Sequence, residues 1–426
     1  MRKSMVSLAA MAASVLLASC GTSKSAEKGS AQKNMDDMVV SRNDQLVDEG
    51  YLILSDAQRG IVNHTNAFAL NLFRNMGGFD SKVVSPISVA YMMGMLANGA
   101  DGQTRQEIMS AIDCKGISLK DLNEFYQMML TRAGHFDKST TINIANYIAL
   151  NDQYQLKDGF KKSMQNYYQA GIENMNFSSS SALKRINGWC SKHTDGMIPR
   201  IIDEVDPSTV SYIMNAIYFN GTWTDKFDKS QTKLENFQGY TRDIKKVQMM
   251  HRHAKYLFMD NDIFSAVNLP YGNRAYSMTV LLPKSGKSID EMMKSMDAKE
   301  LGEVNRKMDE CVVDLKLPRF TTTHEVTLND IISKLGAPGM FTGAADFSNL
   351  ADGNLTISKM LQKAKIEVSE EGTKAAAVTT AMVAMTALRP EPRHVEFHAN
   401  RPFVYMITEA STGAILFMGQ YTGSDI

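Results

Sequence analysis

The segment from Glu370 to Ala381 offers the most distinctive chemistry in this sequence, that of a backbone able to change its structure. Two acids and a glycine lead into nine residues that are nearly all small, compatible with a β-strand, or both. In a strand, the face beginning at Thr373 would carry no charge and nothing larger than valine, while Lys374 would be the only charge on the opposite face. Such a strand can slide between two others without overpacking the core, so we expect a loop that later becomes a strand.

Two other structures would suit the same residues. One is an Ala/Thr-rich surface loop or helix. The other is a membrane span, but the apolar run from Ala375 to Leu388 is shorter than the ~20 residues that a span needs and contains three threonines. The residues that follow favour the strand interpretation, because two apolar runs at 395–407 and 414–419 are joined by a turn at Thr412 and Gly413.

Catalytic and metal-binding motifs are missing from the sequence. It has no dinucleotide-binding, Walker, His-Glu-x-x-His or Gly-x-Ser-x-Gly pattern, so we predict that the protein is not an enzyme and needs no cofactor or metal. His251 and His253 would share one face of a strand and could bind a metal ion, but a solvated surface pair is the simpler interpretation. Beyond Cys20 three cysteines lack metal-ligand spacing, and one disulfide among them stays open: Cys114, Cys190 and Cys311.

The elements that must position the segment are helices first and strands later, which favours an α+β fold over alternating βαβ units. Helices are predicted at 58–76 (after a cap at Ser55), 86–98, 103–112, 119–133, 156–170, 184–193, 288–297 and 325–335. Strands are predicted at 209–220, 246–258, 263–270, 275–283, 310–319, 363–369, 395–397, 402–409 and 414–421, with another beginning at Ile144. No internal repeat or second globular domain is visible.

Size and charge indicate a folded domain with a large core. The chain has 426 residues, of which 44% are hydrophobic and 22% charged. Lysine and arginine number 46, as do aspartate and glutamate, so no basic excess points to nucleic acid as a partner. We expect a monomer.

The first residues are predicted to be a targeting signal that is removed from the folded protein. Residues 1–19 contain Arg2 and Lys3 followed by an apolar stretch, and they end in Leu-Ala-Ser before Cys20, which resembles a bacterial lipobox. Lipidated Cys20 would anchor the chain to a membrane through the polar tether 20–48, in the outer membrane or at the cell surface of a Gram-negative bacterium. The alternative is an ordinary signal peptide that leaves Cys20 free.

The hinge pattern Glu-Glu-Gly-Thr-x-Ala-Ala-Ala at 370–377, followed by Arg-Pro-Phe at 401–403 and Leu-Phe-Met-Gly at 416–419, resembles the serpin family. The resemblance covers roughly residues 55 to 424, and its other landmarks occur in the family's order. They are 84–88, 98–104, 144–146, 186–189, 194–198, 214–223, 269–271, 281–283, 317–320, 335–336 and 345–348.

The resemblance implies a serpin fold: a large mixed β-sheet that accepts an inserted strand, smaller sheets and about nine helices. The serpin domain would span 49–426, with a reactive loop at about 370–394. It also implies a suicide substrate: a protease attacks one loop bond and forms an acyl-enzyme, and the freed loop enters the sheet as a strand. The protease is thereby displaced before it can complete hydrolysis. The alternative within the family is a non-inhibitory serpin that acts as a surface binding or carrier protein.

Counting along the loop from Gly372, the resemblance implies a reactive bond between Thr386 and Ala387, within about three residues because this loop is longer than usual. Its bait would suit elastase-like and subtilisin-like serine proteases, with papain-like cysteine proteases as a third class. The bait residues are Val383, Ala384, Met385 and Leu388. The implied hinge residues are Glu371, Gly372, Thr373, Ala375, Ala376, Ala377 and Thr379, and Trp223 is the implied breach tryptophan. The chain departs from the family at Lys374, where glutamate is usual, and at Gln362, where histidine is common.

Overall fold

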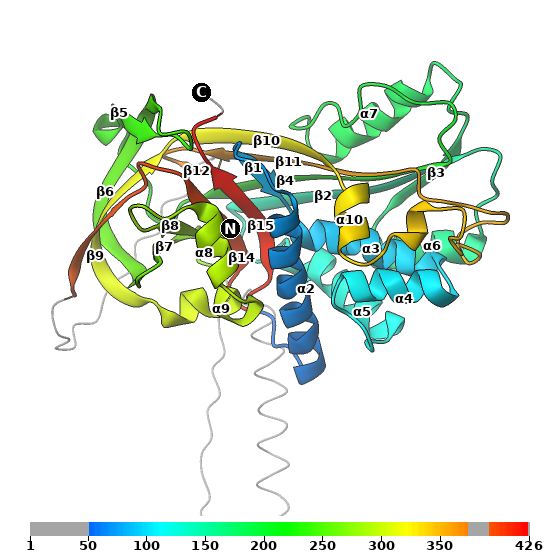
Figure 1. Ribbon diagram of the computed structural model, residues 1–426, viewed down its shortest axis with the longest axis horizontal. Helices are drawn as coiled ribbons and strands as arrows, with labels where there is room; N and C mark the ends of the chain where they lie inside the picture. The colour runs from blue at the N-terminus through cyan, green and yellow to red at the C-terminus, as the bar shows by residue number, and fades with distance from the viewer. Residues whose placement is uncertain (1–50, 374–391, 425–426) are drawn as a thin grey trace, which may run out of the picture. The chain divides into compact units, whose positions relative to one another are not determined.

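The computed structural model describes residues 51–373 and 392–424, which form an α+β fold as predicted (Figure 1). These ranges contain nine α-helices and two β-sheets. The predicted signal segment 1–19, Cys20 and the 20–48 tether lie outside the described residues. So do loop residues 374–391, with the predicted Thr386–Ala387 bond.

The nine helices are between six and twenty residues long. The helices are α2 (Asp56–Asn75), α3 (Pro86–Gly99), α4 (Gly102–Ala111), α5 (Leu119–Met128), α6 (Asp158–Tyr168), α7 (Ala182–His193), α8 (Ile289–Ser295), α9 (Ala298–Glu303) and α10 (Asn329–Lys334). Short turns of other helix types are η1 (Met129–Ala133), η2 (Lys229–Gln231), η3 (Val304–Lys307) and η4 (Gly339–Phe341).

The first sheet has six strands in the order β10-β11-β4-β2-β3, with β12 paired to β4. Its central strands β11 and β4 are parallel, whereas β4 is antiparallel to β2. The strands are β2 (Thr140–Asn151), β3 (Gly171–Met175), β4 (Ser211–Thr222), β10 (Phe320–Thr327), β11 (Lys359–Val368) and β12 (Gly372–Thr373). A parallel pair at the centre of a sheet makes slanted hydrogen bonds and is slightly less stable per residue than an antiparallel pair.

The second sheet has nine strands in the order β1-β15-β14-β8-β7-β6-β9-β13, with β5 paired to β6. Strand β13 lies at one end of this order and pairs with β9 in parallel. The strands are β1 (Lys82–Val84), β5 (Lys233–Gln238), β6 (Ile244–Asp260), β7 (Phe264–Tyr271), β8 (Tyr276–Pro283), β9 (Asp309–Pro318), β13 (His394–His398), β14 (Phe403–Glu409) and β15 (Ile415–Tyr421).

Helices cover both faces of the six-stranded sheet (Figure 1). Helix α3 is buried almost all round, which is why its sequence is apolar on every side. It begins with Pro86 after Ser85, whose hydroxyl accepts a hydrogen bond from the backbone of Ser88. Helix α7 lies on the opposite face and packs against β2 and β4 through Ala182, Ile186 and Cys190.

Most predicted elements are confirmed, including the Ser55 cap on α2, but the predicted helix at 325–335 is wrong in its first half. Residues through Thr327 continue strand β10, and the helix begins at Asn329. The run Thr321-Thr322-Thr323 alternates exposed and buried positions against β11, so β-branched residues there favour the strand. Strands β1, β3, β5, β10 and β12 were not predicted: β10 partly overlaps the predicted helix, and the other four are only two to six residues long.

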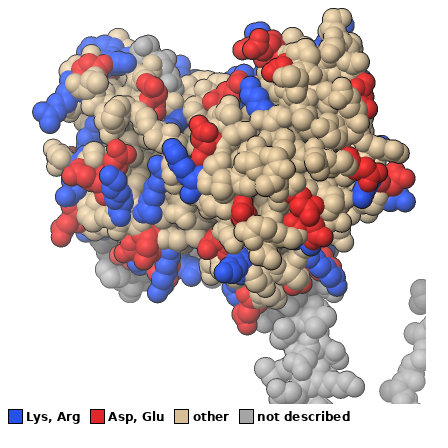
Figure 2. Space-filling view, turned by 45° about the vertical axis from the view of Figure 1, so that its right-hand side comes forward, with Lys and Arg blue, Asp and Glu red and all other residues tan. Residues whose placement is uncertain are grey.

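Charged side chains are intermingled on the face seen in Figure 2, where blue and red groups alternate around broad uncharged areas. This distribution agrees with the equal numbers of acids and bases in the sequence. It offers no extended basic surface on that face for a polyanion.

Candidate functional site

The two central strands of the six-stranded sheet separate at one end. Strands β11 and β4 pair in parallel as far as Lys365 and Tyr218. Beyond that point the last residues of β4, Gly221 and Thr222, pair in antiparallel register with β12. The chain leaving β11 has therefore turned back, and Gly372 and Thr373 enter the space between β11 and β4, which we call the seam.

A tight turn from Ser369 to Gly372 reverses the chain. The amide of Ser369 donates to the carbonyl of Gly372 (2.8 Å), and the amide of Gly372 donates back to the carbonyl of Ser369 (3.1 Å). Gly372 has φ of +137°, and a Cβ there would lie 2.2 Å from the carbonyl oxygen of Gly221. Only glycine satisfies both the backbone angle and the space, so the pivot of the turn depends on this residue.

Thr373 is the first side chain inside the seam and is fully buried. Its hydroxyl lies 2.9 Å from the hydroxyl of Tyr271, whose ring stacks on Trp223 with centroids 4.3 Å apart and planes at 11°. The indole Nε1 of Trp223 donates to the carbonyl of Ser369 (2.9 Å), and its backbone amide donates to the carbonyl of Glu371 (3.0 Å). Trp223 thus holds the turn from two sides.

The two acids of the turn are both paired. Glu370 is buried, and its carboxylate accepts hydrogen bonds from Arg319 and from the hydroxyl of Thr232 (2.7 Å). Burial opposes its charge, but these bonds outweigh burial and hold the pKa of Glu370 below its usual range. Hydrogen bonds from Lys226 and Lys229 likewise lower the pKa of Glu371, at distances of 2.8 and 3.0 Å. Both acids therefore stay ionised at neutral pH and fix the turn to Arg319, between β9 and β10, and to the chain after β4.

Farther along the seam, a buried polar network crosses from β11 to β4. Gln362 of β11 accepts from the amide of Ser85 (2.7 Å) and donates to the side-chain oxygen of Asn215 on β4 (3.0 Å). Asn215 in turn donates to Asn146 on β2 (2.9 Å). Buried amides are costly unless they are paired, so this network stabilises the pairing of β11 with β4.

A family model described as Serpin (serine protease inhibitor) matches residues 63–423, which is most of the chain. The chain belongs to the serpin family. It is 32% identical over 374 residues to Serpin B6 of Pongo abelii, covering 85% of this chain and 99% of that protein. Family membership supports protease inhibition as the general activity and proteases as the general class of partner, and serpins are generally inhibitors rather than enzymes.

Two solved serpin structures have the same fold. The thermophilic serpin tengpin in its native state matches with a TM-score of 0.79 and 28% identity, over 88% of this chain and 96% of tengpin. Human thyroxine-binding globulin, solved in complex with thyroxine, matches with a TM-score of 0.76 and 25% identity, over 85% of this chain and 98% of that chain. The serpin fold predicted from the sequence is therefore confirmed.

The structure brings together four of the site residues that the resemblance implies. Glu371, Gly372, Thr373 and Trp223 meet where β11 and β4 separate. The other predicted site residues lie outside the described part of the serpin: Cys20, Ala375, Ala376, Ala377, Thr379, Val383, Ala384, Met385, Thr386, Ala387 and Leu388.

Several partners of the hinge had no predicted role in the sequence. Arg319 and Tyr271 belong to landmarks of the family, Leu-Pro-Arg-Phe and Leu-Pro-Tyr, so the order of landmarks could have pointed to them. No sequence signal connects Ser85 and Asn215 to Gln362, because they come from three separate elements.

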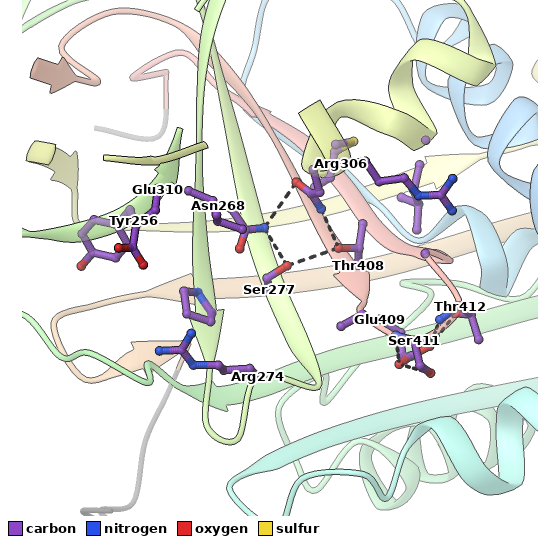
Figure 3. A pocket seen from close by; sticks show the side chains of 18 of the residues that line it. Tyr256, Asn268, Arg274, Ser277, Arg306, Glu310, Thr408, Glu409, Ser411 and Thr412 are labelled. Carbon is purple, nitrogen blue, oxygen red and sulfur yellow. Dashed lines mark hydrogen bonds between the residues drawn. The ribbon is translucent and has the colours of Figure 1, made fainter. Parts of the chain in front are cut away.

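A pocket of about 700 Å³ lies in the nine-stranded sheet, beside α9 and η3 of this serpin (Figure 3). Asn268, Ser277 and Thr408 form a hydrogen-bonded polar wall with Asn305, the amide of Asn268 donating to Ser277 at 2.8 Å. Arg274 and Arg306 also line the pocket (Figure 3). The pocket combines apolar surface with several polar groups, as small-molecule sites do.

The three cysteines of the serpin domain are free and buried, so no disulfide joins them. Burial raises the pKa of Cys114 and Cys190 to about 12, and both thiols are unreactive at neutral pH. Among residues 51–373 and 392–424, no helix is both long and apolar enough to span a bilayer.

Proposed function

We propose that this serpin is a suicide-substrate inhibitor that traps endopeptidases as covalent acyl-enzymes by inserting its reactive loop. One observation carries the proposal: the chain leaving β11 already turns at Gly372 and pairs with the end of β4. Everything beyond Thr373 need only extend a strand whose first two residues are formed. The first step in forming the inserted strand would thus be complete before any protease arrives.

Extending this register defines the inserted strand. With Thr373 opposite Gly221, Ala375 would meet Phe219, Ala377 would meet Ile217, and Val383 would meet Ser211 at the start of β4. Phe219 and Ile217 belong to the main core, so the small face of the loop would be the one that covers it. Thr379 would arrive opposite Asn215, where its hydroxyl could replace the amide of Gln362 as a hydrogen-bond partner.

Insertion would change the pairing of the two central strands of the sheet. The new strand runs antiparallel to both β4 and β11, so one parallel interface is replaced by two antiparallel ones. A net gain on the order of ten backbone hydrogen bonds at ~1 kcal/mol each is available to displace the protease. The native serpin is then a kinetically trapped state.

Displacement stops the protease because catalysis tolerates little error in position. Insertion of eleven strand residues would carry the acyl-enzyme ~35 Å and pull its ester away from the catalytic groups. A misplacement of ~1 Å can already lower the reaction rate about 10²-fold. Removing the ester from its oxyanion hole therefore halts deacylation. The bait around Thr386 and Ala387 suits elastase-like and subtilisin-like enzymes, with papain-like cysteine proteases as a third class.

Mixing the serpin with elastase, subtilisin and trypsin tests the proposal on denaturing gels. We expect a band that survives SDS with elastase or subtilisin, at the summed mass of the protease and the serpin fragment that ends at the cleaved bond. The matched control is the same protease blocked at its active serine, which should give no such band. Clean loop cleavage by every active protease, without a covalent band, would contradict the inhibitory function.

A carrier is the second candidate function, favoured by the pocket beside α9. Thyroxine-binding globulin, a relative of similar fold, is described in complex with thyroxine. The polar wall of Asn268, Ser277 and Thr408 would suit an amphipathic molecule with hydroxyl or carboxylate groups. Clean loop cleavage together with saturable binding of such a probe, weakened by Asn268→Leu, would support this function over inhibition.

We further propose that Cys20 is lipidated and anchors the serpin in the envelope of a Gram-negative bacterium, in the outer membrane or at the cell surface. The Leu-Ala-Ser-Cys sequence at 17–20 supports this, because several acyl chains anchor stably where one does not. Globomycin or Cys20→Ala should move the protein from the membrane fraction to the soluble fraction. Unchanged membrane retention of Cys20→Ala would contradict lipidation.

A further inference from the structure

Strand β13 is the anchor at the C-terminal end of the reactive loop. It is five residues long, lies at the end of the nine-stranded sheet, and pairs in parallel with β9. Phe397 is its only fully buried side chain, and the other four are exposed or half-buried. A short edge strand in parallel pairing has little intrinsic hold on its neighbour, so side-chain contacts decide how firmly it stays.

The pairing of β13 with β9 limits insertion of an uncut loop, because such a loop is attached to a strand at each end. If residues as far as Val383 entered the seam without cleavage, only the ten residues 384–393 would remain to reach β13. Ten residues span at most ~36 Å, about the length of the inserted strand itself. Insertion without cleavage therefore requires β13 to leave β9, and it would consume the bait without capturing a protease.

Asp314 of β9 connects β13 to the sheet through two histidines. Its Oδ2 lies 2.8 Å from Nε2 of His398 on β13, and its Oδ1 lies 2.5 Å from Nε2 of His251 on β6. The three side chains are about one-third exposed, at 31%, 29% and 35% for Asp314, His398 and His251. One carboxylate thus joins three neighbouring strands, and we call this group the His-Asp-His clamp.

The other charged groups on this face leave the clamp dependent on its histidines. Lys316 pairs with Glu235 (2.9 Å) and Lys255 pairs with Glu310 (3.1 Å), so both lysines already have partners. Glu396 of β13 is in register with Asp314, and two adjacent carboxylates oppose the pairing of β9 with β13. The titratable and charged groups of this face are Glu235 on β5, His251, His253 and Lys255 on β6, Glu310, Asp314 and Lys316 on β9, and His394, Glu396 and His398 on β13.

We propose that the His-Asp-His clamp makes the hold on β13 pH-sensitive, tight in mildly acidic surroundings and loose in alkaline ones. Imidazole is the side chain that titrates between pH 5 and 8. Protonation turns its hydrogen bond to Asp314 into a charge-assisted one and offsets the repulsion from Glu396. Lowering the pH therefore favours β13 in place, and raising it favours release. This regulation rests on the inhibitory function proposed above, since it sets how long the uncut bait lasts.

Neither the ionisation of Asp314 nor the repulsion between His253 and His394 reverses this pH dependence. Burial opposes ionisation of Asp314, but hydrogen bonds from His251 and His398 outweigh it and hold the pKa of this carboxyl below its usual range. Asp314 therefore stays charged between pH 5.5 and 8.0. His253 and His394 lie with ring centroids 6.0 Å apart and would repel when both are protonated. Both are exposed, so water and salt reduce that repulsion to about threefold in an equilibrium at most.

The test measures release of β13 directly, without any protease. Hydrogen exchange of the β13 amides is followed at pH 5.5 and 8.0 in the full chain, corrected for unstructured-peptide rates and compared with β14 in the same sample. We expect β13 to open about five- to tenfold more often at pH 8.0. In parallel, uncut protein is incubated at both pH values and its conversion to a heat-resistant form is followed by melting.

Paired double variants separate the clamp from the other histidines. His251→Gln with His398→Gln keeps hydrogen-bond donors beside Asp314 but removes the titration, and should bring the ratio of opening near one. His253→Gln with His394→Gln, which leaves the clamp intact, should keep the wild-type ratio. A wild-type ratio near one, or an unchanged ratio in the first pair, overturns the proposal. Because exchange requires no protease, failure of the clamp and failure of inhibition are observed separately.

Discussion

Replacing Thr373 by arginine is expected to turn the inhibitor into a substrate. Thr373 is fully buried beside Tyr271, and the strand must carry the same face of the loop over the main core. A buried arginine without a partner costs several kcal/mol, and each 1.4 kcal/mol in the barrier slows insertion about tenfold. Hydrolysis of the acyl-enzyme would then precede displacement. We expect the number of serpin molecules consumed per trapped protease to rise at least about fiftyfold.

Lys374→Arg is the matched control for this change. It alters the neighbouring residue on the opposite face, which in the extended register would lie beside the half-exposed Asn220. This variant should trap protease as the natural sequence does. Melting of both intact variants shows whether the fold is kept. One-to-one covalent trapping by a folded Thr373→Arg protein would contradict the insertion mechanism.

Cleavage of the loop is expected to raise the melting temperature by about 20 °C or more. Ten residues from Lys374 to Val383 would gain partners on both β4 and β11, while the parallel pairing between those strands is lost. A net gain on the order of 10 kcal/mol corresponds to a shift of this size at 2–4 °C per kcal/mol. Calorimetry or circular dichroism of intact and nicked protein measures it.

The same measurement on cleaved Thr373→Arg identifies the cause of the increase. Its rise should be much smaller, because the strand cannot enter past a buried charge. If the cleaved natural sequence melted no higher than the intact protein, there would be no stored free energy to displace a protease.

The hinge was predictable because its information is local. Alternation of small residues after Gly372 indicates which face can be buried, and the order of landmarks across the chain indicates the fold. The error at 325–335 arose where strand and helix adjoin within a few residues, around Leu328. Pairing with β11 decides the structure there, and that partner is more than thirty residues away.

Contacts that depend on register were not predictable. His251 was expected to be a solvated surface residue, yet it bonds to Asp314, which is 63 residues away. The network around Gln362 joins β11, β4, β2 and the start of α3. Alternation can say that a side chain points inward, but it does not say which residue of a distant strand lies opposite.

The position at which β4 begins, Ser211, determines how far a captured protease could move away from the serpin. With Val383 opposite Ser211, only three residues, 384–386, separate the last paired position from an ester at Thr386. This three-residue connection is ~10 Å long, which is shorter than the radius of most proteases. The captured protease would therefore be held tightly against the serpin at the end of the sheet where β4 begins. If the cleaved bond lay closer to Pro390, each additional residue would lengthen this connection by ~3.4 Å, and the protease would be held less tightly.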